Sequence, residues 1–263
     1  MKIHIKNLFL GSLLFIQAVF SYGVEDKQLL SIFNKYNVNG TLVISSTDGK
    51  KVYIHNESRA KKNYLPASTF KIPNTLIGLA EGAINPDGHV FLWDGKDKGW
   101  KIWNQNHTLQ SALSNSCIWC YQEVAQDVGR LQYRYHLKKM NYGNRELGNL
   151  TTFWLDGKLR INAYQQIEFL KKLYSERLPY YKKYQKKTKK IMLNESNPSY
   201  KLYGKTGWVM KNGKGIDIGW YVGFLEKDNQ TWFFAINIDL MKDSQRKLRK
   251  QIIKEALHVK RII

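Results

Sequence analysis

Strand patterns at both ends of the chain enclose a middle section with helical periodicity, and this order strongly restricts the fold. Residues 41–46 and 51–55 are β-branched or alternating runs, and the Asp48-Gly49 pair between them is a strong hairpin signal. Three aromatic-rich runs late in the chain predict further strands, at residues 200–208, 218–225 and 231–239. Segments from both ends can therefore join one antiparallel sheet.

The middle section predicts helices. Periodicity typical of amphipathic helices extends from Lys71 to about Lys190. Residues 244–259 carry an apolar stripe that can cover one face of the sheet. We therefore expect an α/β (α+β) fold, in which an antiparallel sheet is flanked by helices and an all-helical lobe is inserted.

A single domain is expected to span residues 24–263. Its sheet lobe would comprise about residues 24–62 and 198–263, and its helical lobe would comprise about residues 63–197. A small-molecule site is expected in the cleft between two such lobes.

Residues 1–23 have the pattern of an export signal that is removed. Two lysines precede an apolar run at residues 8–20, and small residues follow at Ser21 and Gly23. The apolar run is shorter than the roughly 20 residues that a bilayer span needs, and no later stretch comes close to that length. The pattern predicts a periplasmic or secreted protein without stable membrane insertion. We expect a monomer or a homodimer, and the sequence does not distinguish between them.

The chain is strongly basic, with a formal net charge of +21. The charge concentrates in residues 171–190, where lysines alternate with tyrosines. A nucleic-acid-binding patch can have this composition. Because an exported protein without a nucleic-acid motif more often has a solvated helix face of this kind, we expect no nucleic-acid partner.

Cys117 and Cys120 are the only cysteines, and they are spaced as Cys-x-x-Cys. They could close a small disulfide, or they could indicate a thioredoxin-like redox couple. A redox centre normally opens a helix within a βαβ unit, whereas this pair lies in a Ser-Cys-Ile-Trp segment. We therefore favour two buried thiols.

Ser68 and Lys71 bracket a Ser-x-x-Lys tetrad, which can place a hydroxyl one helical turn from an amine. Side chains three residues apart on a helix face each other, at about 5–6 Å between Cβ atoms. A serine hydroxyl is a poor nucleophile until a neighbouring base takes its proton. The tetrad therefore supplies a candidate nucleophile and base.

The same spacing recurs at Ser58/Lys61 and at Ser244/Lys247, so one tetrad alone is weak evidence. Three further motifs follow Ser68 in order, namely Ser116-Cys117-Ile118, Tyr142-Gly143-Asn144 and Lys205-Thr206-Gly207. The first two fall on the predicted helical lobe and the third falls on the predicted sheet. These motifs can therefore meet only at the cleft.

Together these motifs resemble the serine-dependent, penicillin-recognising enzymes, and within them the class D β-lactamases. The resemblance covers nearly all of the chain after residue 23, and it includes the Phe-Trp-Leu-Asp-Gly segment at residues 153–157 and Trp208. It implies a fold like that of serine β-lactamases and penicillin-binding transpeptidases. It also implies hydrolysis of β-lactam antibiotics and resistance to them. One position departs from the family, because Ile118 stands where valine is usual.

The resemblance implies a role for each part of the tetrad. Ser68 would attack the β-lactam carbonyl, and the backbone N–H groups of Ser68 and Trp208 would form the oxyanion hole. Lys71 must first be neutral, and burial can lower a lysine pKa by up to ~3–5 units. In class D enzymes the neutral amine adds carbon dioxide to give a carbamate base, and the indole N–H of Trp154 would hold it. The wall around this amine would be Phe70, Ile118, Trp154 and Leu155.

Further roles follow from the same resemblance. Ser116 would pass the proton to the leaving ring nitrogen, with Lys205 supplying positive potential. Thr206 and Arg249 would bind the substrate carboxylate, for which a planar guanidinium is well suited. Arg246 is close enough in sequence to compete for that role. The other positions that would line the substrate are Ile118, Leu155, Gly207 and Trp208.

We expect no metal and no organic cofactor other than carbon dioxide. A zinc β-lactamase is excluded at this stage, because the histidines show no clustering with other ligands. The histidines after residue 23 are His55, His89, His107, His136 and His258. The nearest alternatives are a penicillin-binding D,D-peptidase and a β-lactam sensor domain. A peptidase usually has a polar amide at position 118, and a sensor would need spanning helices. A non-catalytic basic binding protein would leave the four ordered motifs unexplained.

Overall fold

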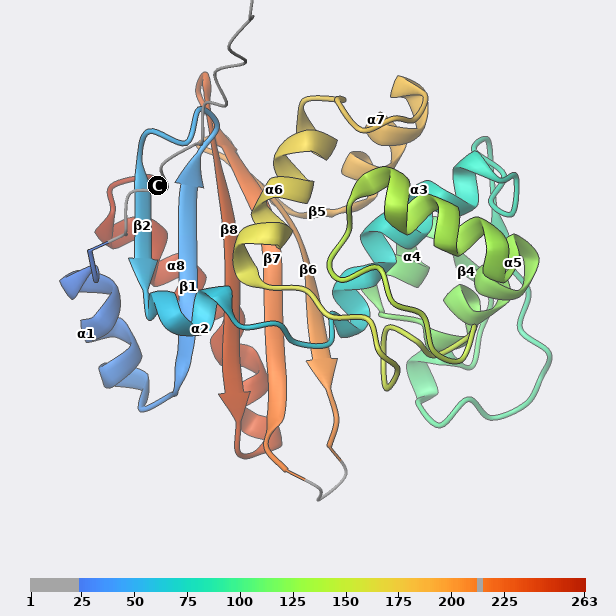
Figure 1. Cartoon of the computed structure of the whole chain (residues 1–263), viewed down its shortest axis with the longest axis horizontal. Coiled ribbons are helices and arrows are strands. Elements are labelled where there is room, and N and C mark those ends of the chain that lie inside the picture. The colour runs from blue at the N-terminus through green and yellow to red at the C-terminus, as the bar shows by residue number, and fades with distance from the viewer. Residues whose placement is uncertain (1–23, 212–214) are drawn as a thin grey trace, which may run out of the picture.

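A six-stranded antiparallel sheet organises the molecule (Figure 1). The computed structural model describes residues 24–211 and 215–263, so the predicted export signal lies outside the described residues. The strand order is β2-β1-β8-β7-β6-β5, and every neighbouring pair is antiparallel. The strands are β1 (Gly40–Ser46), β2 (Val52–His55), β5 (Leu193–Ser196), β6 (Lys201–Val209), β7 (Asp217–Lys227) and β8 (Gln230–Leu240). The prediction of one antiparallel sheet built from both ends of the chain is confirmed.

The two faces of the sheet are covered by different helices. Side chains alternate along a strand, so Leu42 and Ile44 of β1 face one way and Val43 faces the other. The first face packs under α1 (Lys27–Tyr36) and α8 (Leu248–Val259). The second face packs under α2 (Glu57–Lys61) and α6 (Ala163–Tyr174). Both faces are therefore apolar, and the sheet lies between two helical layers.

The helical lobe lies beside β6 and is built around α3 (Lys71–Ala80) (Figure 1). Every residue of this helix from Lys71 to Leu79 is buried, as expected for a helix enclosed on all sides. Around it lie α4 (Leu109–Ser114), α5 (Ile118–Met140), α7 (Lys182–Ile191) and the short ladder of β3 (Val90–Phe91) with β4 (His107–Thr108). The described part of the chain also contains the 3₁₀ turns η1 (Ala67–Phe70), η2 (Lys101–Trp103) and η3 (Asp243–Lys247).

Two segments that were predicted within the helical lobe, α6 and β5, lie with the sheet instead. Helix α6 packs on the sheet through apolar residues such as Ile167 and Leu170, and β5 extends the sheet by pairing with β6. Strand β5 could not be recognised from its residue pattern, because its side chains are mostly exposed and do not alternate between apolar and polar. The sheet lobe therefore includes more of the chain than the predicted residues 24–62 and 198–263.

Within residues 24–211 and 215–263, the structure contains no helix long and apolar enough to cross a membrane.

The sheet contains a close approach that only glycine allows. A methyl group at Gly223 of β7 would lie 2.0 Å from the backbone oxygen of Tyr203 and 2.8 Å from the ring of Phe234. We expect Gly223→Ala to lower the free energy of unfolding by about 1–3 kcal/mol, because the neighbouring strands must move. Gly88→Ala is the matched control, since a methyl there meets nothing within 4 Å, and it should change stability by less than about 0.5 kcal/mol. Urea unfolding of both variants measures the difference, and equal stabilities would contradict the prediction.

Candidate active site

Ser68 and Lys71 lie at the junction of the η1 turn and α3. Ser68 is half-buried within η1, and Lys71 is the first residue of α3. The Lys71 amine lies 3.3 Å from the Ser68 hydroxyl oxygen. The turn is held by the Ala67 N–H, which donates to the Trp154 carbonyl at 2.9 Å. The tetrad thus places the amine within reach of the hydroxyl proton.

The Lys71 amine is completely buried in apolar surroundings. Its nitrogen lies 5.3 Å from the centre of the Tyr121 ring, and the Phe70 ring stacks on Trp154 at 5.7 Å. Burial disfavours the ammonium ion and lowers the pKa of Lys71 to about 7. A substantial neutral fraction is therefore present at neutral pH, so the nitrogen can accept a proton or react as a nucleophile.

Trp154 has an unusual feature beside this pocket. Its indole N–H is buried and has no hydrogen-bond partner among the described residues. Buried N–H groups are almost always paired, since leaving one unpaired costs about 1–3 kcal/mol. The unpaired donor indicates that an acceptor from outside the polypeptide belongs next to it.

A second hydroxyl–amine pair, formed by Ser116 and Lys205, connects the helical lobe with the sheet. Lys205 of β6 donates to the Ser116 hydroxyl at 2.5 Å and to the Thr206 carbonyl at 3.0 Å. Burial, followed by the charges of Lys71, Arg249 and Lys250, holds the pKa of Lys205 well below its usual value. Motifs from the helical lobe and the sheet therefore meet as the sequence analysis expected.

Glycine allows β6 to lie directly against the η1 turn. A methyl group at Gly207 would lie 2.9 Å from the Pro66 oxygen and 3.1 Å from the Thr69 methyl carbon. The Trp220 indole fixes the same segment by donating to the Leu65 carbonyl at 2.9 Å. This packing carries the segment from Lys205 to Trp208 alongside Ser68.

Arg249 reaches the site from α8 on the far side of the sheet. Its guanidinium donates to the Gly207 carbonyl at 2.6 Å and to the Arg246 carbonyl at 2.7 Å. The side chain passes over Gly219, where a methyl group would lie 2.8 Å from its Cδ. Burial and the Arg246 charge lower the pKa of Arg249 to about 10, so it remains protonated at neutral pH.

Arg246 occupies a different place. Its guanidinium lies 4.5 Å from the Trp208 ring and 5.7 Å from the Trp100 ring, and it pairs with Asp243 at 3.0 Å. Trp208 itself donates to Asp217 at 2.8 Å. A hollow of about 310 Å³ adjoins this group and is lined in part by Trp208 and Arg246, but it contains none of the Ser68, Lys71 or Ser116 side chains. The structure thus separates the two arginines.

The remaining predicted residues are two apolar side chains and a turn. Ile118 begins α5 immediately after the Ser116 loop, and Leu155 packs against the larger apolar core. Gly143 forms a left-handed turn against the Arg160 carbonyl, which a side chain would obstruct, and Asn144 bonds the same segment. The turn of the Tyr-Gly-Asn motif is therefore structural.

The other two Ser-x-x-Lys tetrads lie elsewhere. Ser58 is on α2 and donates to the Asn56 side chain at 2.9 Å, and Ser244 is in η3.

One residue that contacts the site was not identified from the sequence. Tyr121 lies three residues beyond Ile118 on α5, faces Lys71 and bonds Thr75 at 2.7 Å. Its position three residues after Ile118 could have predicted this contact, because residues three apart lie on the same face of a helix.

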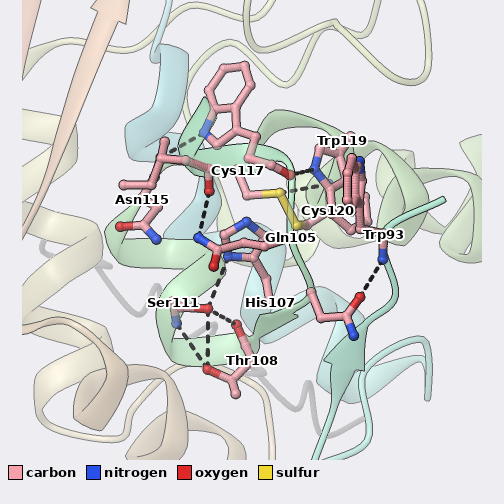
Figure 2. The surroundings of a disulfide bond; sticks show 12 residues. Trp93, Gln105, His107, Thr108, Ser111, Asn115, Cys117, Trp119 and Cys120 are labelled. Carbon is pink, nitrogen blue, oxygen red and sulfur yellow. Dashed lines mark hydrogen bonds between the residues drawn. A yellow bond between two sulfur atoms is a disulfide. The ribbon is translucent and has the colours of Figure 1, made fainter. Parts of the chain in front are cut away.

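The prediction that Cys117 and Cys120 remain thiols is wrong, because the two form a disulfide (Figure 2). Cys117 is the N-cap of α5 and Cys120 lies in its first turn, so their Cα atoms are 5.6 Å apart. That separation lies within the range a disulfide can bridge.

The expectation that no histidine lies with other ligands is also wrong, since His107 of β4 lies beside this sulfur pair.

Comparisons with known proteins agree with this geometry. A family model for the penicillin-binding protein transpeptidase domain matches residues 23–258. The β-lactamase OXA-10 of Pseudomonas aeruginosa is 39% identical over 236 residues, which cover 88% of each chain. The β-lactamase OXA-48 of Klebsiella pneumoniae is 37% identical over 254 residues, which cover 96% of this chain and 95% of that relative.

Solved structures of class D β-lactamases are also similar to this chain. FUS-1 (OXA-85), a class D β-lactamase from Fusobacterium nucleatum subsp. polymorphum, has a TM-score of 0.87 at 33% identity and covers 91% of this chain and 100% of its own. The class D β-lactamase YbXI from Nostoc has a TM-score of 0.84 at 37% identity, over 88% of this chain and 97% of its own. In sequence and in fold, this chain belongs to the class D β-lactamase family, whose architecture is that of the penicillin-binding transpeptidases.

Proposed function

We propose that this protein hydrolyses β-lactam antibiotics through an acyl-enzyme on Ser68 and so confers resistance to them. The observation that carries the proposal is the meeting of two hydroxyl–amine pairs, Ser68 with Lys71 and Ser116 with Lys205, at the junction of the lobes. Both amines are buried, where fixed charges act more strongly than in water. Neither a metal nor an organic cofactor takes part in this reaction.

Acylation begins when the Ser68 oxygen attacks the β-lactam carbonyl carbon and its proton passes to a base on Lys71. The backbone N–H groups of Ser68 and Trp208 stabilise the oxyanion, as the family resemblance implies. The ring C–N bond then breaks, and the Ser116 hydroxyl delivers a proton to the leaving nitrogen while it regains one from the protonated base on Lys71. That base next takes a proton from water as the water attacks the ester, and the proton passes to the Ser68 oxygen as the opened product acid leaves.

The base on Lys71 is proposed to be a carbamate, formed when the neutral amine adds carbon dioxide and releases a proton. A carboxylate at this nitrogen would supply the general base for acylation and for deacylation. Two observations support the assignment: burial brings the pKa of Lys71 to about 7, and the buried Trp154 N–H lacks an acceptor among the described residues. A plain amine base, as in a peptidase, would leave that N–H unexplained.

The substrate carboxylate is proposed to bind Thr206 and Arg249. Lys205 and Arg249 are both buried, and no carboxylate of the described residues contributes to their pKa shifts. Buried basic groups without such compensation favour an anionic ligand. A β-lactam that carries a carboxylate provides this charge next to the Gly207 backbone, which Arg249 already contacts.

We also propose that the protein is exported and acts in the periplasm or outside the cell. The pattern of residues 1–23 supports this location. The disulfide between Cys117 and Cys120 supports it independently, because such bonds persist mainly in oxidising compartments. Whether the protein is a monomer or a homodimer stays a prediction that oligomer measurements will decide.

Ser68→Ala should abolish covalent labelling by penicillin and lower the turnover number by at least about 10³-fold, because the attacking oxygen is lost. Mass spectrometry of protein mixed with penicillin, together with hydrolysis of a chromogenic cephalosporin, measures both effects. Ser58→Ala is the matched control and should behave as the wild type. Equal labelling of Ser68→Ala and wild type would refute the nucleophile assignment.

Arg249→Ala should raise KM by about tenfold or more for substrates that carry a carboxylate, because a charged hydrogen bond is typically worth about 1.5–3 kcal/mol. Arg246→Ala should have the smaller effect, since that guanidinium lies over Trp208 and Trp100. Steady-state kinetics with a β-lactam and with its carboxylate ester separate substrate binding from general damage. A larger effect of Arg246→Ala, or an equal loss with the ester, would argue against the assignment.

Turnover in buffer depleted of carbon dioxide should fall as the pH falls through about 7, because protonated Lys71 cannot carry a carbamate. Added bicarbonate should restore turnover on the alkaline side, where the amine is neutral. A ¹³C resonance from labelled bicarbonate should appear in the wild type and be lost in Trp154→Phe, which keeps the ring but removes the N–H. Full activity without carbon dioxide, together with normal turnover by Trp154→Phe, would leave Lys71 as a plain amine base.

A further inference from the structure

A buried group of three potential metal ligands lies next to the proposed site, where β4 passes the start of α5. The ligand atoms of His107, Cys117 and Cys120 lie within 4.8 Å of one another, and all three residues are fully buried. Figure 2 shows the His107 ring beside the sulfur bridge. None of the three has a role in the proposed hydrolysis, so their clustering needs its own explanation.

His107 presents an unused nitrogen to the sulfurs. Its Nδ1 lies 3.1 Å from the Ser111 hydroxyl oxygen, and that hydroxyl donates to the Thr108 carbonyl at 3.2 Å. The Ser111 oxygen is thus free to accept from Nδ1–H, which leaves Nε2 with its lone pair. Nε2 is buried and has no hydrogen-bond partner among the described residues. A histidine ligand held through its other ring nitrogen is the usual arrangement at metal sites.

The sulfur pair has the spacing of a metal-binding turn. Two cysteines separated by two residues are a common half of a zinc site. The Cys117 sulfur also accepts the Cys120 N–H at 3.2 Å at the N-terminus of α5, where the helix dipole favours negative charge. Zinc bonds of about 2.3 Å to sulfur and about 2.0–2.1 Å to nitrogen would bring these atoms to separations of about 3.5–4 Å. Opening the disulfide and a small shift of the side chains would satisfy this geometry.

We propose that His107, Cys117 and Cys120 form a thiol-gated zinc site, which is closed while the disulfide is intact and binds one Zn²⁺ when the disulfide is reduced. A phosphine reductant and water supply the two electrons and two protons that convert the disulfide into two thiols, and the phosphine becomes its oxide. Zn²⁺ then replaces the two thiol protons and takes Nε2 of His107 as its third protein ligand, and water is left to fill the fourth position.

Charge balance selects zinc over a monovalent thiophilic ion. Two thiolates, a neutral imidazole and Zn²⁺ sum to zero, whereas Cu⁺ with the same ligands would leave a buried negative charge. The proposed zinc site takes no part in β-lactam hydrolysis. Zinc binding and the disulfide exclude each other, because both use the same two sulfur atoms.

The test uses the purified protein, unfolded in urea, reduced with a phosphine and refolded under nitrogen, with circular dichroism to confirm refolding. After exposure to Zn²⁺ and desalting, the reduced protein should retain one zinc ion per chain, and the oxidised protein should retain none. His107→Ala should weaken binding by at least about tenfold. His89→Ala is the matched control, because His89 bonds Asn85 and is not among the three residues whose ligand atoms cluster, and it should bind zinc as the wild type does.

X-ray absorption of the zinc-loaded wild type covers the case in which His107→Ala does not fold. The zinc edge should show two sulfur ligands and at least one imidazole. Retention of no zinc by the reduced wild type, unchanged affinity in His107→Ala, or a spectrum without sulfur would each overturn the proposal. Equal zinc on the reduced and oxidised proteins would show adventitious surface binding and would overturn it as well.

Discussion

The burial of two lysine amines beside Ser68 and Ser116 is the constraint on which the rest of the structure depends. Removing a lysine amine from water disfavours its ammonium form, and here the apolar layer of Phe70, Trp154 and Tyr121 imposes that removal on Lys71. The same enclosure brings Lys205 close enough for the two amines to raise each other's free energy when both are charged. An enclosure of this kind favours anionic partners, and this is the physical basis of the proposed lysine carbamate and of the proposed site for a substrate carboxylate.

The fold was largely predictable because its main elements carry strong local patterns. The strand pattern at residues 41–46 and the stripe of the C-terminal helix each identify a face that must be covered, and their order along the chain then restricts the sheet. Strand β5 was missed because its pairing with β6 rests on backbone hydrogen bonds and not on apolar side chains. Helix α6 was placed in the wrong layer because an apolar stripe shows that a helix is covered, but not by which partner.

The site was predictable to the extent that motifs fix side chains within one element. Ser68 and Lys71 lie on one turn, so their contact follows from spacing, and the meeting of Ser116 with Lys205 required only the two-lobe architecture. The unpaired Trp154 N–H and the position of His107 beside the sulfurs depend on loop packing between distant segments. The disulfide was misjudged for a related reason, since the start of α5 had to be located to within one residue before the two sulfurs could be seen to meet.

The backbone at the two proposed catalytic serines shows how the structure fixes them. Ala67, directly before Ser68, has φ 48°, and Ser116 has φ 54°, so both adopt the left-handed conformation that residues with side chains rarely take. Each such residue costs of order 1–3 kcal/mol and persists only where its surroundings over-determine it. At Ala67 the surroundings are the Trp154 carbonyl and β6, and at Ser116 they are the Lys205 amine and the helix capped by Cys117. Left-handed backbone at Ala67, directly before Ser68, and at Ser116 itself therefore argues that both hydroxyls are held in place by the junction of the lobes.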